Sequence, residues 1–228
     1  DEFAPAYNAE TKTYQIATAQ ELAWVSEQAK DGNNFKGKTL VVMNDIDLNG
    51  ANWTPIADFH GTFKGLASTK AATYPTISNF TVNVEECAGL FGDITGGKLS
   101  DFNVRNARIT ANHYAGAVVG FMHGSGSITN VHVQNSAVTV TPVLNADNKY
   151  DDGDKAGAIA GYFCADGTNA TMRMENCSAT DVDILAYRDL GGLVGCLNGT
   201  DAYVGNCNVT DVRVTADTDY DYASNSAI

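Results

Sequence analysis

A glycine pattern that recurs four times constrains the fold of this chain more than any other feature. Each copy reads small, small, apolar, apolar, Gly, and the copies occupy residues 87–92, 115–120, 156–161 and 190–195. After each copy, apolar and polar residues alternate, which is typical of a half-buried strand. One aligned column holds Asp101, Asn130, Asn176 and Asn206, which are 29, 46 and 30 residues apart. The repeat unit is therefore 29 to 30 residues long, and one unit carries an insertion.

Few repeat architectures are compatible with a unit of this length. No amphipathic helix recurs, which argues against helical solenoids, and a propeller blade needs four full strands in about 40 residues. We therefore expect an all-β fold, a right-handed parallel β-helix in which like residues stack about 4.8 Å apart on neighbouring turns. Columns rich in Asn and Asp should form the bends, where Asn tolerates left-handed backbone and side-chain amides bond along the stack. A second such column holds Asn106, Asn135, Asp181 and Asp211.

The N-terminal region differs from the repeats. Thr18 and Glu21 have the spacing of a capping box, and Gly32 stands where a helix would stop. We predict a helix over about 19–31 that, together with Trp24, covers exposed strand edges at the end of the β-helix. We expect a single domain over 1–228, with a cap region at 13–38, coils at 39–216, insertions at about 66–76, 143–155 and 165–171, and a tail at 217–228.

Charge and cysteine content exclude several classes of protein. The net charge of −13 and pI near 4.5 argue against nucleic acid as a partner, because phosphate binding needs clustered Lys and Arg. No stretch is long and apolar enough to be a transmembrane segment. The five cysteines include no CxxC pair, so a zinc site is not expected. Cys177 and Cys207 share a column; we interpret them as small buried hydrophobes, with a disulfide between them as the alternative.

The chain resembles a family of secreted bacterial proteins that carry the repeat named the GLUG motif, frequent on the surface of Bacteroidetes. The resemblance rests on the run at 192–195 (GLVG) and on the order of ELAWV at 21–25, NDIDL at 44–48, WTPI at 53–56 and FHGTFKG at 59–65. It implies a right-handed parallel β-helix and a secreted or cell-surface location, which suits a chain that begins at Asp1 without a signal segment. It implies no reaction. The chain departs from the family at Lys64, where an acidic residue is usual, and in the loops at 66–76 and 143–155.

Candidates for catalysis are few. Asp181 and Asp211 could lie about 5 Å apart on adjacent turns, a separation that suits a retaining glycosidase. Their column also contains Asn, however, so we interpret it as a stack of residues that form the bends. We expect His132 to point outward beside Arg105 of the previous turn, as a solvated residue with a general base as the alternative. His60, His113 and His123 show no local metal-ligand spacing.

Two kinds of residue suggest binding. Four carboxylates in the inserted loop are a candidate calcium site, with a solvated acidic loop as the default interpretation: Asp147, Asp151, Asp152 and Asp154. A weaker acidic cluster contains Asp217, Asp219 and Asp221. No other cofactor is indicated. Aromatic residues beside the connections, Tyr150, Tyr162 and Tyr187, suggest a recognition face.

Three functions remain open. The first is a non-catalytic binding or adhesion module, a monomer or part of a longer chain, whose rigid face binds a glycan or a host or bacterial surface protein. The second is a polysaccharide-active lyase or hydrolase, and the third is a structural spacer. A binder predicts aromatic residues clustered on one face, whereas an enzyme predicts a groove with a perturbed carboxylate or His.

Overall fold

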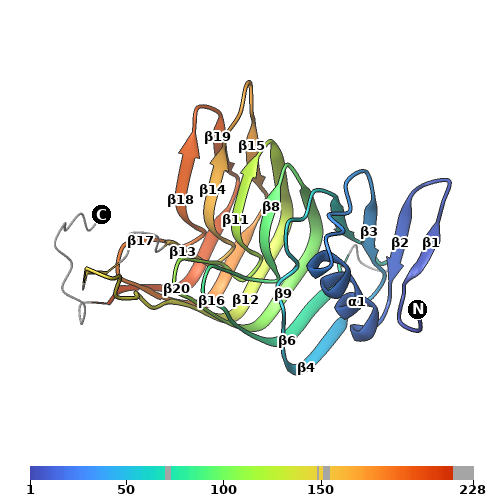
Figure 1. The fold of residues 1–228 in the computed structure, drawn as a ribbon, viewed down its shortest axis with the longest axis horizontal. Helices are drawn as coiled ribbons and strands as arrows, with labels where there is room; N and C mark the ends of the chain where they lie inside the picture. The colour runs from blue at the N-terminus through green and yellow to red at the C-terminus, as the bar shows by residue number, and fades with distance from the viewer. Residues whose placement is uncertain (70–72, 148, 151–154, 218–228) are drawn as a thin grey trace.

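The computed structural model describes residues 1–217, except 70–72, 148 and 151–154, as β-strands and one helix (Figure 1). Its strands form three sheets, named A, B and C here, which are parallel apart from the pairing of β1 with β2. Sheet C contains, in spatial order, β7 (Cys87–Ala88), β10 (Tyr114–Ala115), β13 (Lys155–Gly157) and β17 (Asp189–Gly191). Sheet B contains β8 (Phe91–Thr95), β11 (Val119–Gly124), β14 (Ala160–Ala165) and β18 (Val194–Gly199).

Sheet A is the largest sheet. Its main path contains β1 (Ala6–Asn8), β2 (Thr13–Ile16), β3 (Thr39–Val42), β5 (Thr62–Gly65), β9 (Lys98–Ala111), β12 (Gly126–Val140), β15 (Met172–Glu175) and β19 (Ala202–Gly205). Four more strands join the sheet off this main path, through the pairing of β6 with β9 and of β16 with β12: β4 (Ile46–Asn52), β6 (Thr76–Asn83), β16 (Ser178–Ala186) and β20 (Asn208–Ala216). Each repeat unit thus adds one strand to sheet C, one to sheet B and one or two to sheet A. The predicted all-β class is confirmed.

The strand register reproduces the columns found in the sequence. Val104 pairs with Val133, Val133 with Ala179 and Ala179 with Val209. The last apolar column pairs in the same way, through Ile109, Val138, Ile184 and Val214. These side chains are buried in the first three units, because the alternating pattern turns them toward the common core.

The bends occur at the predicted Asn and Asp columns. The column from Asp101 to Asn206 has φ angles of 49–65°, and the column from Asn106 to Asp211 has φ angles of 49–54°. Side-chain amides connect neighbouring turns: Asn130 donates to Asp101 over 2.8 Å, and Asn106 donates to Asn79 over 2.6 Å. Both predicted roles of these columns, left-handed backbone and bonding along the stack, are therefore present.

The helix α1 (Ala19–Lys30) ends one residue earlier than predicted, and its capping box between Thr18 and Glu21 is complete. Leu22 and Val25 are buried in the core, and the helix contacts β4, whose other neighbour in sheet A is β6. The helix therefore contacts a strand whose one described partner in sheet A is β6, and its covering role stays a prediction. Sheet A, however, begins before the predicted start of the coils at 39, because β2 already pairs with β3 in parallel. Four residues are too short an alternation to recognise in the sequence.

At the opposite end of the stack, the inward residues of the last described strand are exposed. Val209 is 48% exposed and Val214 is 45% exposed, although their column partners one turn earlier, Ala179 and Ile184, are buried. Cys177 is buried and Cys207 partly buried, and all five cysteines are free thiols. The packing role predicted for this pair is therefore the one observed.

Candidate functional site

Three aromatic rings form a stripe, hereafter the aromatic stripe, on the outer side of sheets B and C. Tyr114 on β10 directly precedes the glycine pattern and Phe121 on β11 directly follows it, so that the tight turn between the two strands brings their rings to a centroid distance of 5.6 Å. Tyr162 lies on the next turn, 5.1 Å from Phe121 and 5.6 Å from Tyr114. All three side chains are half-buried. Their rings are therefore fixed by packing and still reach solvent.

Lys155 lies in the middle of the aromatic stripe. Its Nζ is 5.8 Å from the ring centre of Tyr114 and 5.2 Å from that of Tyr162, and it donates to Asp189 Oδ2 over 2.8 Å. Burial lowers the pKa of Lys155, but the hydrogen bond and charge of Asp189 outweigh burial, and its pKa lies above the usual value. Burial also raises the pKa of Tyr114, against the opposing charge of Lys155. Lys155 is therefore a fixed cation and Tyr114 a neutral phenol at pH 7.

Polar groups extend the aromatic stripe at both ends. The His123 ring stacks on Phe121 at 4.5 Å and 15°, and its Nδ1 lies 3.2 Å from Asp166 Oδ2. At the other end, Asn198 Nδ2 donates to the Tyr162 hydroxyl over 2.8 Å. The surface thus offers apolar ring faces flanked by hydrogen-bonding groups.

Sequence reasoning found this surface only in part. Tyr162, one of the three predicted binding tyrosines, belongs to the aromatic stripe. The other two, Tyr150 and Tyr187, pack against each other with their ring centroids 6.4 Å apart. Tyr114 and Phe121 were missed. Their signal was their position: each flanks the same glycine turn, so the turn brings them together.

The acidic pair Asp181 and Asp211 occupies one bend column with φ angles of 53° and 54°. Arg213 donates to Asp181 Oδ1 over 3.3 Å and also binds Asp183. The ladder interpretation of this column is supported by its backbone geometry, and the Asp181 carboxylate is engaged in an exposed ion pair.

The predicted neighbour of His132 was wrong. His132 on β12 pairs with Asn103 of the previous turn, whereas Arg105 pairs with Gln134. The sequence columns already separate the two positions by one inward residue, so their side chains are offset by two residues along the strand.

His132 instead belongs to a chain of hydrogen bonds across three turns. Its Nδ1 lies 2.6 Å from Ser178 Oγ, its Nε2 lies 3.0 Å from Asn130 Oδ1, and Asn130 Nδ2 donates to Asp101 over 2.8 Å. Burial lowers the pKa of His132, so the ring is neutral at pH 7. His132 and Ser178 are half-buried on the outer face of sheet A.

The predicted calcium ligands fall mostly outside the described residues. This holds for Asp151, Asp152 and Asp154, and likewise for Asp219 and Asp221. Asp147 is exposed, and its backbone N–H donates to Asn145 Oδ1. Within the described part of the chain, no three His, Cys, Asp or Glu side chains form a group that could hold a metal ion.

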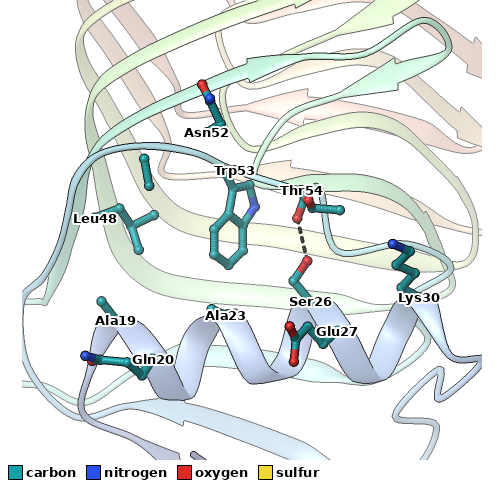
Figure 2. A pocket seen from close by; sticks show the side chains of 11 residues that line it. Ala19, Gln20, Ala23, Ser26, Glu27, Lys30, Leu48, Asn52, Trp53 and Thr54 are labelled. Carbon is teal, nitrogen blue, oxygen red and sulfur yellow. Dashed lines mark hydrogen bonds between the residues drawn. The ribbon is translucent and has the colours of Figure 1, made fainter.

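A cleft of about 430 Å³ lies between α1 and the chain formed by β4 and the two residues after it (Figure 2). Leu48 and Trp53 point into the gap, and Ser26 Oγ donates to the Thr54 carbonyl over 2.6 Å. Trp53 is 6% exposed and its indole N–H donates to the Leu90 carbonyl over 2.9 Å. Trp53 therefore acts mainly as packing between the helix and the stack.

The chain matches no protein-family model, no curated protein and no solved structure. Among the described helical residues, none forms a helix with the length and apolarity that a membrane crossing requires.

Proposed function

We propose that this chain is a right-handed parallel β-helix that works as a secreted or cell-surface recognition module and binds a glycan along the aromatic stripe. The observation that carries the proposal is the clustering of Tyr114, Phe121 and Tyr162 on one surface, which is what a binder rather than a spacer predicts. Right-handed connection is the general rule for parallel strands, and the repeated order of sheets C, B and A supports a coil.

The chemistry of the aromatic stripe suits a sugar. The C–H faces of a pyranose ring pack on aromatic rings, and its hydroxyl groups need donors and acceptors beside those rings. Lys155 and Asn198 supply donors, and Asp189 and Asp166 supply acceptors. Because neighbouring turns are about 4.8 Å apart, a linear glycan lying along the stack would place successive sugars near successive turns.

Tight packing also favours binding over chemistry at this surface. Its rings are held by neighbours on several turns, so little conformational entropy is lost when a ligand binds. Its one described cation, Lys155, is neutralised by Asp189, which favours a neutral glycan over a strongly anionic one.

A glycan array probed with the purified protein, with and without calcium, tests this proposal. We expect binding that Tyr162→Ala weakens about tenfold, or ~1.4 kcal/mol. Tyr203→Ala is the matched control, because Tyr203 is 44% exposed on β19 and packs on Arg173 instead. Each array hit is also incubated and checked for shortened product. Equal losses in both variants would contradict the assigned surface, and turnover would favour a polysaccharide-active enzyme.

A further inference from the structure

We propose that Ser178 is an activated nucleophile, with His132 as its general base, and that this pair transfers acyl groups from small carboxylic esters. The pair lies on the outer face of sheet A, away from the aromatic stripe on sheets B and C, and is independent of the proposed glycan binding. Ser178 is the first residue of β16, and His132 is its register partner on β12. Adjacent parallel strands thus hold the hydroxyl and the ring side by side at 2.6 Å.

The hydrogen-bond chain determines which nitrogen of His132 carries the proton. The Asp101 carboxylate only accepts, so the Asn130 amide must donate to it and present Oδ1 to the histidine. An acceptor at 3.0 Å from Nε2 requires the proton to be on Nε2. Nδ1 is then an unprotonated acceptor, and the Ser178 hydroxyl donates to it. This is the tautomer that a base for Ser178 needs.

The reaction balances with water as the co-reactant. Ser178 Oγ attacks the ester carbonyl carbon while its proton passes to His132 Nδ1, and the alcohol leaves with that proton as the C–O bond breaks. Water then attacks the acyl-serine, giving its proton to Nδ1, and the acid is released as Ser178 regains a proton. The Nε2–H bond to Asn130 stabilises the imidazolium formed in each step. Asn208 is exposed and is the register partner of Ser178 on β20, so its amide is the neighbouring donor that we assign to the oxyanion.

Both groups reach solvent, and the flat sheet face limits the substrate class. His132 and Ser178 are half-buried, and their pairing lies on a sheet face whose neighbouring outward residues are Asn103 and Thr180. Such a flat face encloses little of a substrate, so we expect it to accept short, unhindered acyl groups such as acetyl rather than long acyl chains.

The test uses a fluorophosphonate probe and p-nitrophenyl acetate on the full chain. We expect the probe to label Ser178, located by peptide mass mapping, and labelling to fall at least tenfold in His132→Gln. Ser178→Ala should abolish both labelling and ester hydrolysis. Ser127 is an internal control: it is half-buried on the same sheet, but its register partners are Lys98 and Arg173. Thermal melting confirms that each variant folds.

A second measurement stands even if a variant fails to fold. The ¹⁵N chemical shifts of the His132 ring distinguish a protonated Nε2 from a protonated Nδ1 in the unmodified protein. Protonation at Nδ1 would overturn the proposal, because the ring could not accept the serine proton. Labelling of Ser178 no faster than of Ser127, or labelling unchanged in His132→Gln, would also overturn it.

Discussion

At the scale of single residues, the bends depend on side chains that tolerate left-handed backbone. Asn106 and Asn135 share a bend column with φ angles of 53° and 49°. A residue other than Gly, Asn or Asp costs about 1–2 kcal/mol in this conformation. Asn106 also bonds to Asn79, whereas no side-chain hydrogen bond of Asn135 is found within the described residues. The pair therefore separates backbone preference from ladder bonding.

We predict different responses of these two positions to substitution. Asn106→Gly keeps the backbone but removes the amide, and should lower the free energy of unfolding by about 1 kcal/mol. Asn135→Gly should change the free energy of unfolding by only about a few tenths of a kcal/mol. Alanine at either position should add about 1–2 kcal/mol of backbone strain. Urea unfolding measures all four variants. Equal losses for the two glycine variants would show that the ladder bond contributes nothing.

A second residue-scale prediction concerns Cys87. Burial, together with the charges of Asp93 and Glu86, raises its pKa to about 12, against 9.0 for an ordinary thiol. At pH 8 its thiolate fraction is then about a thousandfold smaller than that of an ordinary cysteine, and only the thiolate reacts. Iodoacetamide should therefore alkylate Cys87 slowly, and faster by about tenfold per pH unit up to pH 10. Cys87→Ser identifies the adduct, and alkylation at pH 8 as fast as in urea would contradict the raised pKa.

At the scale of elements, the glycine pattern is explained by the close approach of sheets B and C. A Cβ on Gly120 would lie 2.7 Å from the Ala88 backbone nitrogen, and one on Gly161 would lie 2.6 Å from that of Ala115. No side chain fits there, so the turn brings two strands together that a larger residue would separate. The same approach places Tyr114 against Phe121 on the outside of the turn.

Alanine at two equivalent glycines should therefore have unequal effects. Gly120→Ala overpacks against backbone and should cost about 1–3 kcal/mol of stability. Gly92→Ala, in the first copy of the pattern, meets its nearest atoms at 3.3 Å and should cost less than about 1 kcal/mol. Thermal melts of the two variants give the comparison. A Gly92→Ala variant as unstable as Gly120→Ala would contradict the close-approach explanation.

At the scale of the whole molecule, the sequence predicts the repeated layers well and the surface poorly. Columns such as Val104–Val133 could be aligned by eye, because every turn repeats one inward pattern. The aromatic stripe combines residues from both sides of the glycine turn and from two successive repeat units. At each of these positions, the type of residue differs between the copies of the repeat. The aligned columns place His132 beside Ser178, but alternation does not predict their hydrogen bond, since rotamers decide which outward neighbours bond. The strand β2 was missed because its four residues are too few to show a clear alternation of apolar and polar residues.

Stability should decline along the stack toward β20. Val133 is buried between two turns, whereas Val209 is 48% exposed and packs against one. Hydrogen exchange should show the amides of β12 protected by nearly the global free energy of unfolding, and those of β20 by much less. Equal protection of the two strands would mean that the last turn is stabilised by contacts beyond those of the described residues.

The parallel register has a mechanical consequence. The strands cross the long axis of the stack, so their interstrand hydrogen bonds run along it, from β1 at one end to β20 at the other (Figure 1). Tension between the two ends therefore pulls directly against the bonds of one turn at a time rather than shearing many together. Under load the molecule would lengthen in steps of one turn, starting with the turn that contains β20, while the turns behind it keep their shape.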